Sequence, residues 1–136
     1  MTLNTEKQSP SSLKVALVVE DNKPNMDYLL FILKKFNITA VTAYSGEEAL
    51  QVLEGKHFDI MLLDIALGKG ISGVTLMETF REMKKYKDIP IIAVTAFGEE
   101  IVGKVKHGGF SDVVRKPYTP DRLQNVLEKC NLTVSL

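Results

Sequence analysis

The sequence has a single cysteine and no net charge, and each of these features excludes a class of protein. Its one thiol, Cys130, cannot form a disulfide within the chain, which excludes a fold held by internal disulfide bonds. The 17 basic residues balance the 17 acidic ones, and no Lys or Arg run offers a nucleic-acid surface. No apolar run approaches the roughly 18 residues of a membrane span, and no secretory signal pattern is present. We therefore expect a cytoplasmic protein without a direct nucleic-acid or membrane partner.

The chain of 136 residues has the length of one domain, and 45% of its residues are hydrophobic. A polar segment that ends in Ser9-Pro10-Ser11-Ser12 precedes the first apolar run. We interpret residues 1–12 as a disordered leader or linker and residues 13–136 as a single domain.

Beyond this leader, short apolar runs alternate with longer segments of helical periodicity. Each run consists mainly of Val, Ile and Leu without polar alternation, which is typical of parallel strands covered on both faces. Five such runs are present: Val15–Val19, Ile38–Ala43, Phe58–Leu63, Ile91–Val94 and Asp112–Val114.

The segments between and after the runs carry helix signals. Asn22 is placed to cap a helix with Pro24 in its first turn, and Ser45 begins a capping box with Glu48. Thr119 precedes the last helix. Apolar residues at helical spacing mark the faces that we expect to be buried: Met26, Leu29, Leu30 and Leu33; Leu76, Phe80 and Met83; Ile101, Val102 and Val105; and Leu123, Val126, Leu127 and Cys130.

Strand–helix alternation repeated five times predicts a doubly wound α/β fold, with a five-stranded parallel sheet between two layers of helices. For five strands we expect the flavodoxin-like order 2-1-3-4-5. Sheets of this kind bind their ligands at the carboxyl ends of the strands, so the residues that follow each run are the candidates for a functional site.

Polar side chains follow four of the five runs: Glu20-Asp21, Asp64, Thr95 and Lys116-Pro117, in chain order. Three carboxylates at one edge repel each other unless protons or a cation intervene, and Mg²⁺ prefers such oxygen ligands. Asp64 can act as a nucleophile that forms an acyl phosphate. Lys116 supplies a positive charge and Thr95 a hydroxyl donor for phosphoryl oxygens. The pattern therefore predicts a site for Mg²⁺-dependent phosphoryl transfer.

These four motifs, in this order, resemble those of the response regulator receiver domain, a chemotaxis-regulator-like module of two-component signalling. The resemblance extends from about Lys14 to Leu132. It implies a phosphoacceptor module, not an enzyme, whose donor is a histidine kinase or a histidine phosphotransfer protein. A downstream protein target is a further expected partner. Stand-alone regulator, receiver excised from a larger regulator or hybrid kinase, and phosphate shuttle all stay open.

The resemblance also implies a role for each motif residue. The Lys116-Pro117 bond is expected to be cis, which would aim the lysine over the acceptor. The implied roles are phosphoacceptor for Asp64, direct Mg²⁺ ligands for Asp21, Asp64 and the backbone carbonyl of Ala66, water-mediated ligand for Glu20, and phosphoryl contacts for Lys116 and, on activation, Thr95.

The sequence departs from the family pattern at two positions. The loop Ala66–Gly73 lacks the usual proline and is one residue longer. Val113 stands where an aromatic switch residue is usual, and valine is too short and stiff at χ1 to replace its movement. Without the aromatic residue, the switch has two possible outcomes. We favour a signal carried by the loop Ala96-Phe97-Gly98, because Gly98 gives that loop backbone freedom. The other is a muted switch, which would suit a phosphate relay.

Two other function classes have specific sequence tests. A haloacid-dehalogenase-type phosphatase needs a second Asp two residues after its nucleophile, and Ala66 occupies that position. A pseudo-receiver that only binds partners usually loses the acceptor, an acidic residue or the lysine, and all of these are present here.

Overall fold

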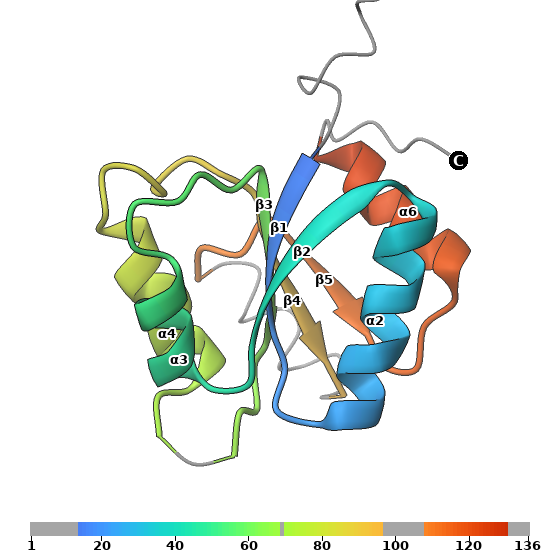
Figure 1. Ribbon diagram of the computed structural model, residues 1–136, viewed down its shortest axis with the longest axis horizontal. Coiled ribbons are helices and arrows are strands. Elements are labelled where there is room, and N and C mark those ends of the chain that lie inside the picture. The colour runs from blue at the N-terminus through green and yellow to red at the C-terminus, as the bar shows by residue number, and fades with distance from the viewer. Residues whose placement is uncertain (1–13, 69, 97–107, 131–136) are drawn as a thin grey trace, which may run out of the picture.

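A central parallel sheet separates two layers of helices in the computed structural model, which describes residues 14–68, 70–96 and 108–130 (Figure 1). The sheet has the order β2-β1-β3-β4-β5, and every neighbouring pair is parallel. The predicted doubly wound fold and strand order are therefore confirmed. The strands are β1 (Lys14–Val19), β2 (Ile38–Ala43), β3 (Ile60–Asp64), β4 (Ile91–Thr95) and β5 (Asp112–Arg115).

One strand begins later than its apolar pattern predicted. β3 starts at Ile60 and not at Phe58, because Asp59 forms two hydrogen bonds with Val15 of β1. Its carboxylate accepts a hydrogen bond from the Val15 N–H at 2.8 Å, and its own N–H donates to the Val15 carbonyl at 2.8 Å. A side chain thus replaces the backbone acceptor at this position, so the regular ladder begins one residue further on.

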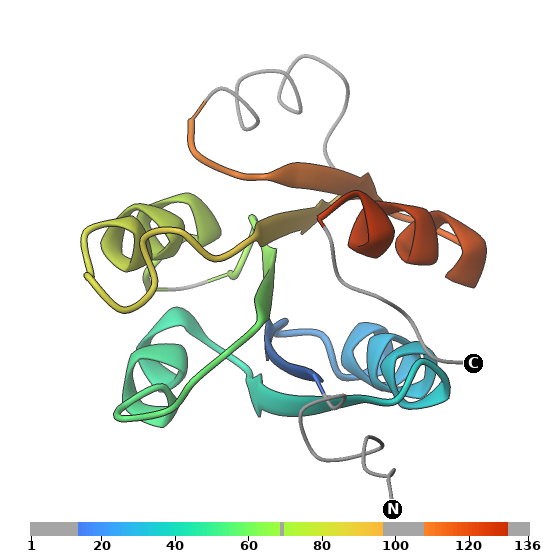
Figure 2. The same cartoon turned by 90° about the horizontal axis from the view of Figure 1, so that it is seen from above.

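The helices of the described residues are α2, α3, α4 and α6, and they cover both faces of the sheet, as Figure 2 shows from above. One layer contains α3 and α4, and the other contains α2 and α6 (Figure 1). Their bounds are α2 (Lys23–Lys35), α3 (Gly46–Val52), α4 (Gly73–Arg81) and α6 (Pro120–Lys129).

The predicted caps begin the helices at the expected residues. Asn22, Ser45 and Thr119 each accept a hydrogen bond from the backbone N–H three residues ahead. The capping box at Ser45 differs in one detail, because the Glu48 carboxylate accepts from the Tyr44 N–H at 2.7 Å and not from the cap residue itself. Side chains at helix starts satisfy backbone donors that have no partner within the helix.

Two expectations about helix faces need correction, and two further predicted segments lie outside the described residues. Met83 lies after the end of α4 and is only partly buried, and Cys130 is a half-buried residue just after α6. The helix expected around Ile101, Val102 and Val105 and the leader 1–12 lie outside the described residues. Within the described residues, no helix is long and apolar enough to cross a membrane.

The two faces of the sheet form separate hydrophobic clusters, because alternate residues of a strand point to opposite faces. In β1, Leu17 and Val19 pack under α3 and α4, whereas Ala16 and Val18 pack under α2 and α6. All four are at most 1% exposed. The strands are thus held from both sides, which keeps their carboxyl ends in fixed positions.

Tyr86 fastens the end of α3 to the cluster beneath α4. Its side chain is buried, and its hydroxyl shares its single proton between the carbonyls of Leu53 at 2.9 Å and Lys56 at 2.7 Å. Burial raises the pKa of the Tyr86 phenol above its ordinary value of 10.0. The folded state therefore holds this proton more tightly than the unfolded state does.

We expect Tyr86→Phe to lower the free energy of unfolding by about 1–2 kcal/mol, because the two carbonyls lose the one hydroxyl proton that they share. Since the pKa is raised in the folded state, the stabilisation is complete below pH 10.0 and declines as the pH rises above it. Urea unfolding at pH 7 and at alkaline pH measures both effects. Exposed Tyr44 gives the control, and equal stability of Tyr86→Phe and Tyr44→Phe would contradict the prediction.

Candidate functional site

The carboxyl ends of four strands bring the predicted site residues to one edge of the sheet. Glu20 directly follows β1, Asp64 ends β3, Thr95 ends β4, and Lys116 directly follows β5. The Lys116 N–H donates to the Thr95 carbonyl at 2.7 Å, which continues the pairing of β4 with β5. The side chain of Thr95 is fully buried there.

Three carboxylates meet at this edge. Glu20, Asp21 and Asp64 each offer an oxygen within 4.8 Å of the other two. Glu20 is 3% exposed and Asp64 6% exposed, whereas Asp21 faces solvent. Buried like charges at this spacing need a compensating cation, and a group of carboxylate oxygens open to water on one side matches the preferences of Mg²⁺.

The Lys116 ammonium lies between the two buried carboxylates. Its Nζ is 2.7 Å from Glu20 Oε1 and 3.1 Å from Asp64 Oδ2. Burial by itself lowers the pKa of Lys116, but the hydrogen bonds and charges of Glu20 and Asp64 outweigh it and raise the pKa above 10.5. Lys116 is therefore a permanent cation at neutral pH.

The second oxygen of each buried carboxylate binds a backbone donor. Glu20 Oε2 accepts from the Asn22 N–H at 3.0 Å, and Asp64 Oδ1 accepts from the Ala66 N–H at 3.0 Å. Both carboxylates are thus oriented by the loops that follow their own strands. The predicted contribution of the Ala66 carbonyl to metal binding stays a prediction.

Glycines shape the loop that follows Asp64. Gly68 has a φ of +66°, and a Cβ there would lie 3.0 Å from Asp21 Oδ2. A Cβ on Gly73, the first residue of α4, would lie 2.1 Å from the Asp64 carbonyl oxygen. Sequence reasoning noted the length of this loop but missed these contacts, although its high glycine content was a signal of close backbone approach.

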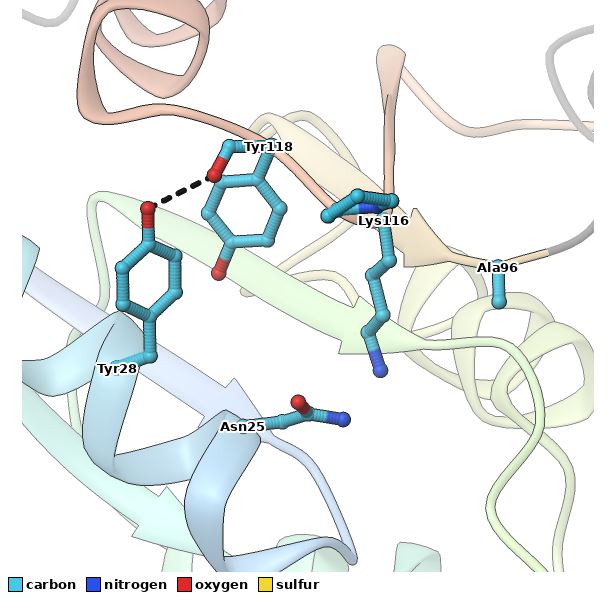
Figure 3. Close-up of a pocket in the computed structure, with 6 residues that line it drawn as sticks. Asn25, Tyr28, Ala96, Lys116 and Tyr118 are labelled. Atoms are coloured by element: carbon cyan, nitrogen blue, oxygen red, sulfur yellow. Dashed lines mark hydrogen bonds between the residues drawn. The ribbon is translucent and has the colours of Figure 1, made fainter.

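A pocket of about 500 Å³ opens beside Lys116 (Figure 3). The Tyr28 hydroxyl donates to the Tyr118 carbonyl at 2.8 Å, and the two rings lie 5.4 Å apart. Burial, helped by Tyr28 and Glu20, raises the pKa of Tyr118. The sequence analysis did not find this pocket, because its walls are separate in the chain: Asn25, Tyr28, Ala96, Lys116, Pro117 and Tyr118.

The predicted geometry after β5 is confirmed at one point. The Lys116-Pro117 peptide bond is cis. Figure 3 shows the Lys116 side chain extending from this segment between Ala96 and Asn25.

Comparison with known proteins agrees with this fold. Residues 16–128 match the model of the response regulator receiver domain family. Among curated proteins, the polar-differentiation response regulator DivK of Brucella ovis is 31% identical over 112 residues, which cover 80% of this chain and 89% of the relative. The chain therefore belongs to the response regulator receiver domain family of two-component signalling.

Solved structures show the same architecture. A CheY-like receiver domain from Methylobacillus flagellatus has a TM-score of 0.77 at 25% identity, with 87% of this chain and 98% of that chain covered. The receiver domain of a sensor histidine kinase from Pseudomonas aeruginosa has a TM-score of 0.79 at 24% identity, with 86% and 96% covered. That second structure holds a magnesium ion in its active-site cleft.

Proposed function

We propose that this receiver domain accepts a phosphoryl group on Asp64, in a reaction that requires Mg²⁺, and then changes its protein-binding surface. One observation carries the proposal. The Asp64 carboxylate is 6% exposed and lies 3.1 Å from a permanent cation, Lys116, within a cluster of two further carboxylates. This arrangement combines a nucleophile with charges placed to neutralise phosphoryl oxygens.

The donor set fits Mg²⁺ as the resident ion. Asp21, Asp64 and the Ala66 carbonyl would hold it directly, and Glu20 would reach it through water. When bound, the ion neutralises charge on the carboxylates and on the phosphoryl oxygens. The magnesium ion in the Pseudomonas receiver supports this assignment.

Asp64, Lys116 and Thr95 each have a separate role in phosphoryl transfer. A carboxylate oxygen of Asp64 forms the new bond to phosphorus as the bond from phosphorus to the donor's imidazole nitrogen breaks, and the electron pair stays on that nitrogen. Lys116 would bind a phosphoryl oxygen. Thr95 would supply a hydroxyl donor once the group is in place. The donor is a phosphohistidine on a histidine kinase or phosphotransfer protein.

The phosphoryl group would be bound to Asp64 of the chain itself, and its hydrolysis would regenerate the same carboxylate. We therefore propose a signalling module and not an enzyme that turns over a separate substrate. Ala66 occupies the position at which a phosphatase of the haloacid-dehalogenase type needs an acid/base carboxylate, and its N–H instead binds Asp64. A pseudo-receiver is disfavoured because the two buried carboxylates and the lysine form one connected cluster.

The direct test is chemical. The protein is incubated with Mg²⁺ and acetyl phosphate, and the adduct is mapped by mass spectrometry. We expect one acyl phosphate, at Asp64, that fails to form in EDTA. An adduct at another residue would contradict the proposal.

The output step stays a prediction. Val113 is 3% exposed and belongs to the cluster under α3 and α4. A short buried side chain at this position cannot swing from solvent into the fold, which supports a signal carried elsewhere. The segment we expect to carry it begins at Ala96, and its residues Phe97 and Gly98 lie outside the described residues.

We expect Asp21→Ala to weaken Mg²⁺ binding by about tenfold or more, because one of the carboxylate ligands is lost. Asp21 is exposed, so the fold should persist. NMR titration of Mg²⁺ measures the affinity from the amide shifts around Asp64. Asp88→Ala is the matched control, since it removes an exposed carboxylate just before β4, at the opposite edge of the sheet. Equal Mg²⁺ affinity of the two variants would place the ion elsewhere.

A further inference from the structure

The loop between β3 and α4 is attached to the neighbouring helix α3 by a side chain outside the acidic cluster. Glu47, in the first turn of α3, accepts a hydrogen bond at Oε2 from the Ile71 N–H at 3.1 Å. The two residues are 24 positions apart in the chain. The contact therefore joins two separate strand-to-helix connections at the same edge of the sheet.

Glycines on both sides allow this close contact. A Cβ on Gly70, where φ is +84°, would lie 2.6 Å from Glu47 Oε2. A Cβ on Gly46 would lie 2.8 Å from the Ile71 Cβ. Each segment thus has a glycine where the other one touches it, so the Glu47 carboxylate and the Ile71 side chain both fit against bare backbone.

The same loop touches the site at its other end. The Ala66 N–H binds Asp64 Oδ1 at 3.0 Å, and Gly68 lies against Asp21, since a Cβ there would be 3.0 Å from Oδ2. Only a few residues separate these contacts from Ile71. A displacement at Ile71 would therefore move the backbone that surrounds both carboxylates.

We propose that Glu47 is a positioning residue for the cation site. It holds the loop backbone at Gly70 and Ile71, so that Ala66 and Gly68 stay in place beside Asp64 and Asp21. The loop contains no proline that would restrict its backbone, and the hydrogen bond from α3 supplies a restraint in its place. This inference rests on the proposed function, because it assumes that Mg²⁺ binds at the acidic cluster.

The test compares Glu47→Ala with Glu47→Gln. Glutamine keeps an oxygen that can accept from the Ile71 N–H, whereas alanine removes the acceptor. The control is Glu54→Ala, which removes an exposed carboxylate just beyond the other end of α3. For each variant, Mg²⁺ affinity is measured by NMR titration, and the rate of phosphorylation by acetyl phosphate is measured across a range of Mg²⁺ concentrations.

We expect Glu47→Ala to weaken Mg²⁺ binding about tenfold, the lower end of the usual effect when a partner that orients a ligand is lost. Glu47→Gln and Glu54→Ala should stay within about twofold of the wild type, since neither removes the hydrogen bond. Saturating Mg²⁺ should restore the phosphorylation rate of Glu47→Ala, because Glu47 touches no reacting atom. Thermal unfolding of each variant without Mg²⁺ separates this effect from a general loss of folding, which added Mg²⁺ would also repair.

Gly46→Ala tests the same contact from the other side and replaces Glu47→Ala if that variant does not fold. Its Cβ would push Ile71 away, so it should also weaken Mg²⁺ binding. Wild-type affinity in Glu47→Ala or in Gly46→Ala would overturn the inference, and so would an equal loss in Glu47→Gln and Glu47→Ala. A wild-type protein that binds no Mg²⁺ would overturn the proposed function and the inference together, whereas normal binding in every variant would overturn the inference alone.

Discussion

Replacing Asp64 with asparagine is expected to abolish acyl-phosphate formation completely. The amide has nearly the shape of the carboxylate, and its oxygen can still accept from the Ala66 N–H. It lacks the negative charge and the nucleophilicity that a bond to phosphorus requires. No other carboxylate of the cluster should replace it, because Asp64 alone ends β3 between Lys116 and the loop that begins at Ala66.

The measurement uses acetyl phosphate with Mg²⁺, followed by intact-mass analysis and a hydroxylamine test, which cleaves acyl phosphates. Asp64→Asn should show no mass increase, and the control Asp88→Asn should match the wild type. Thermal unfolding checks that Asp64→Asn is folded, which we expect because Lys116 keeps its 2.7 Å contact with Glu20. A full adduct in Asp64→Asn would mean that another residue is the acceptor.

The second large effect is expected from Lys116→Met, which keeps an unbranched side chain of similar length and removes the charge. Glu20 and Asp64 would then lie buried with no cation between them. Loss of one partner from a buried ion pair typically costs about 3 kcal/mol or more. We therefore expect a drop of about 3 kcal/mol in the free energy of unfolding when Mg²⁺ is absent.

Mg²⁺ should reverse much of this loss. The ion would compensate the same carboxylates, and it would no longer be repelled by the ammonium, so Lys116→Met should bind Mg²⁺ more tightly than the wild type. Phosphorylation should still be strongly slowed, because the positive contact to the phosphoryl oxygens is missing. Urea unfolding with Mg²⁺ and with EDTA measures the first effect, with Lys84→Met as an exposed control.

The pH dependence of stability distinguishes the contribution of the Lys116 charge from that of the packing of its side chain. The Lys116 pKa is raised above 10.5 in the folded state, so its stabilisation is complete below that pH and is lost as the pH rises through the folded value. The wild type should lose this contribution at alkaline pH, whereas Lys116→Met should not. Identical pH profiles and identical Mg²⁺ affinities would contradict a cationic role for Lys116.

Local patterns in the sequence predicted most helices and strands, because the interactions that begin and end these elements lie within a few residues of one another. The caps at Asn22, Ser45 and Thr119 act on N–H groups only three residues away. Where a side chain intervened, the prediction was wrong by a residue or two. Asp59 displaced the start of β3 through a bond to Val15, which lies 44 positions earlier.

The strand order and the edge that carries the site were also predictable. Right-handed crossovers and the alternation of strands with helices leave few topologies, and parallel strands end at a common edge. Every predicted site residue follows or ends a strand at that edge. The roles of Asp64, Thr95, Lys116 and the metal ligands remain predictions that the experiments above test.

The sequence by itself determined the fold class, the strand order and which residues gather at the edge of the candidate site, because these follow from periodicity, chirality and position along each strand. Only the tertiary structure decided which groups touch: Lys116 with Glu20 across 96 positions, Tyr28 with Tyr118 across 90, and Glu47 with Ile71 across 24. Such pairs depend on how separate loops approach one another after the sheet has formed. No spacing within a single segment encodes that approach.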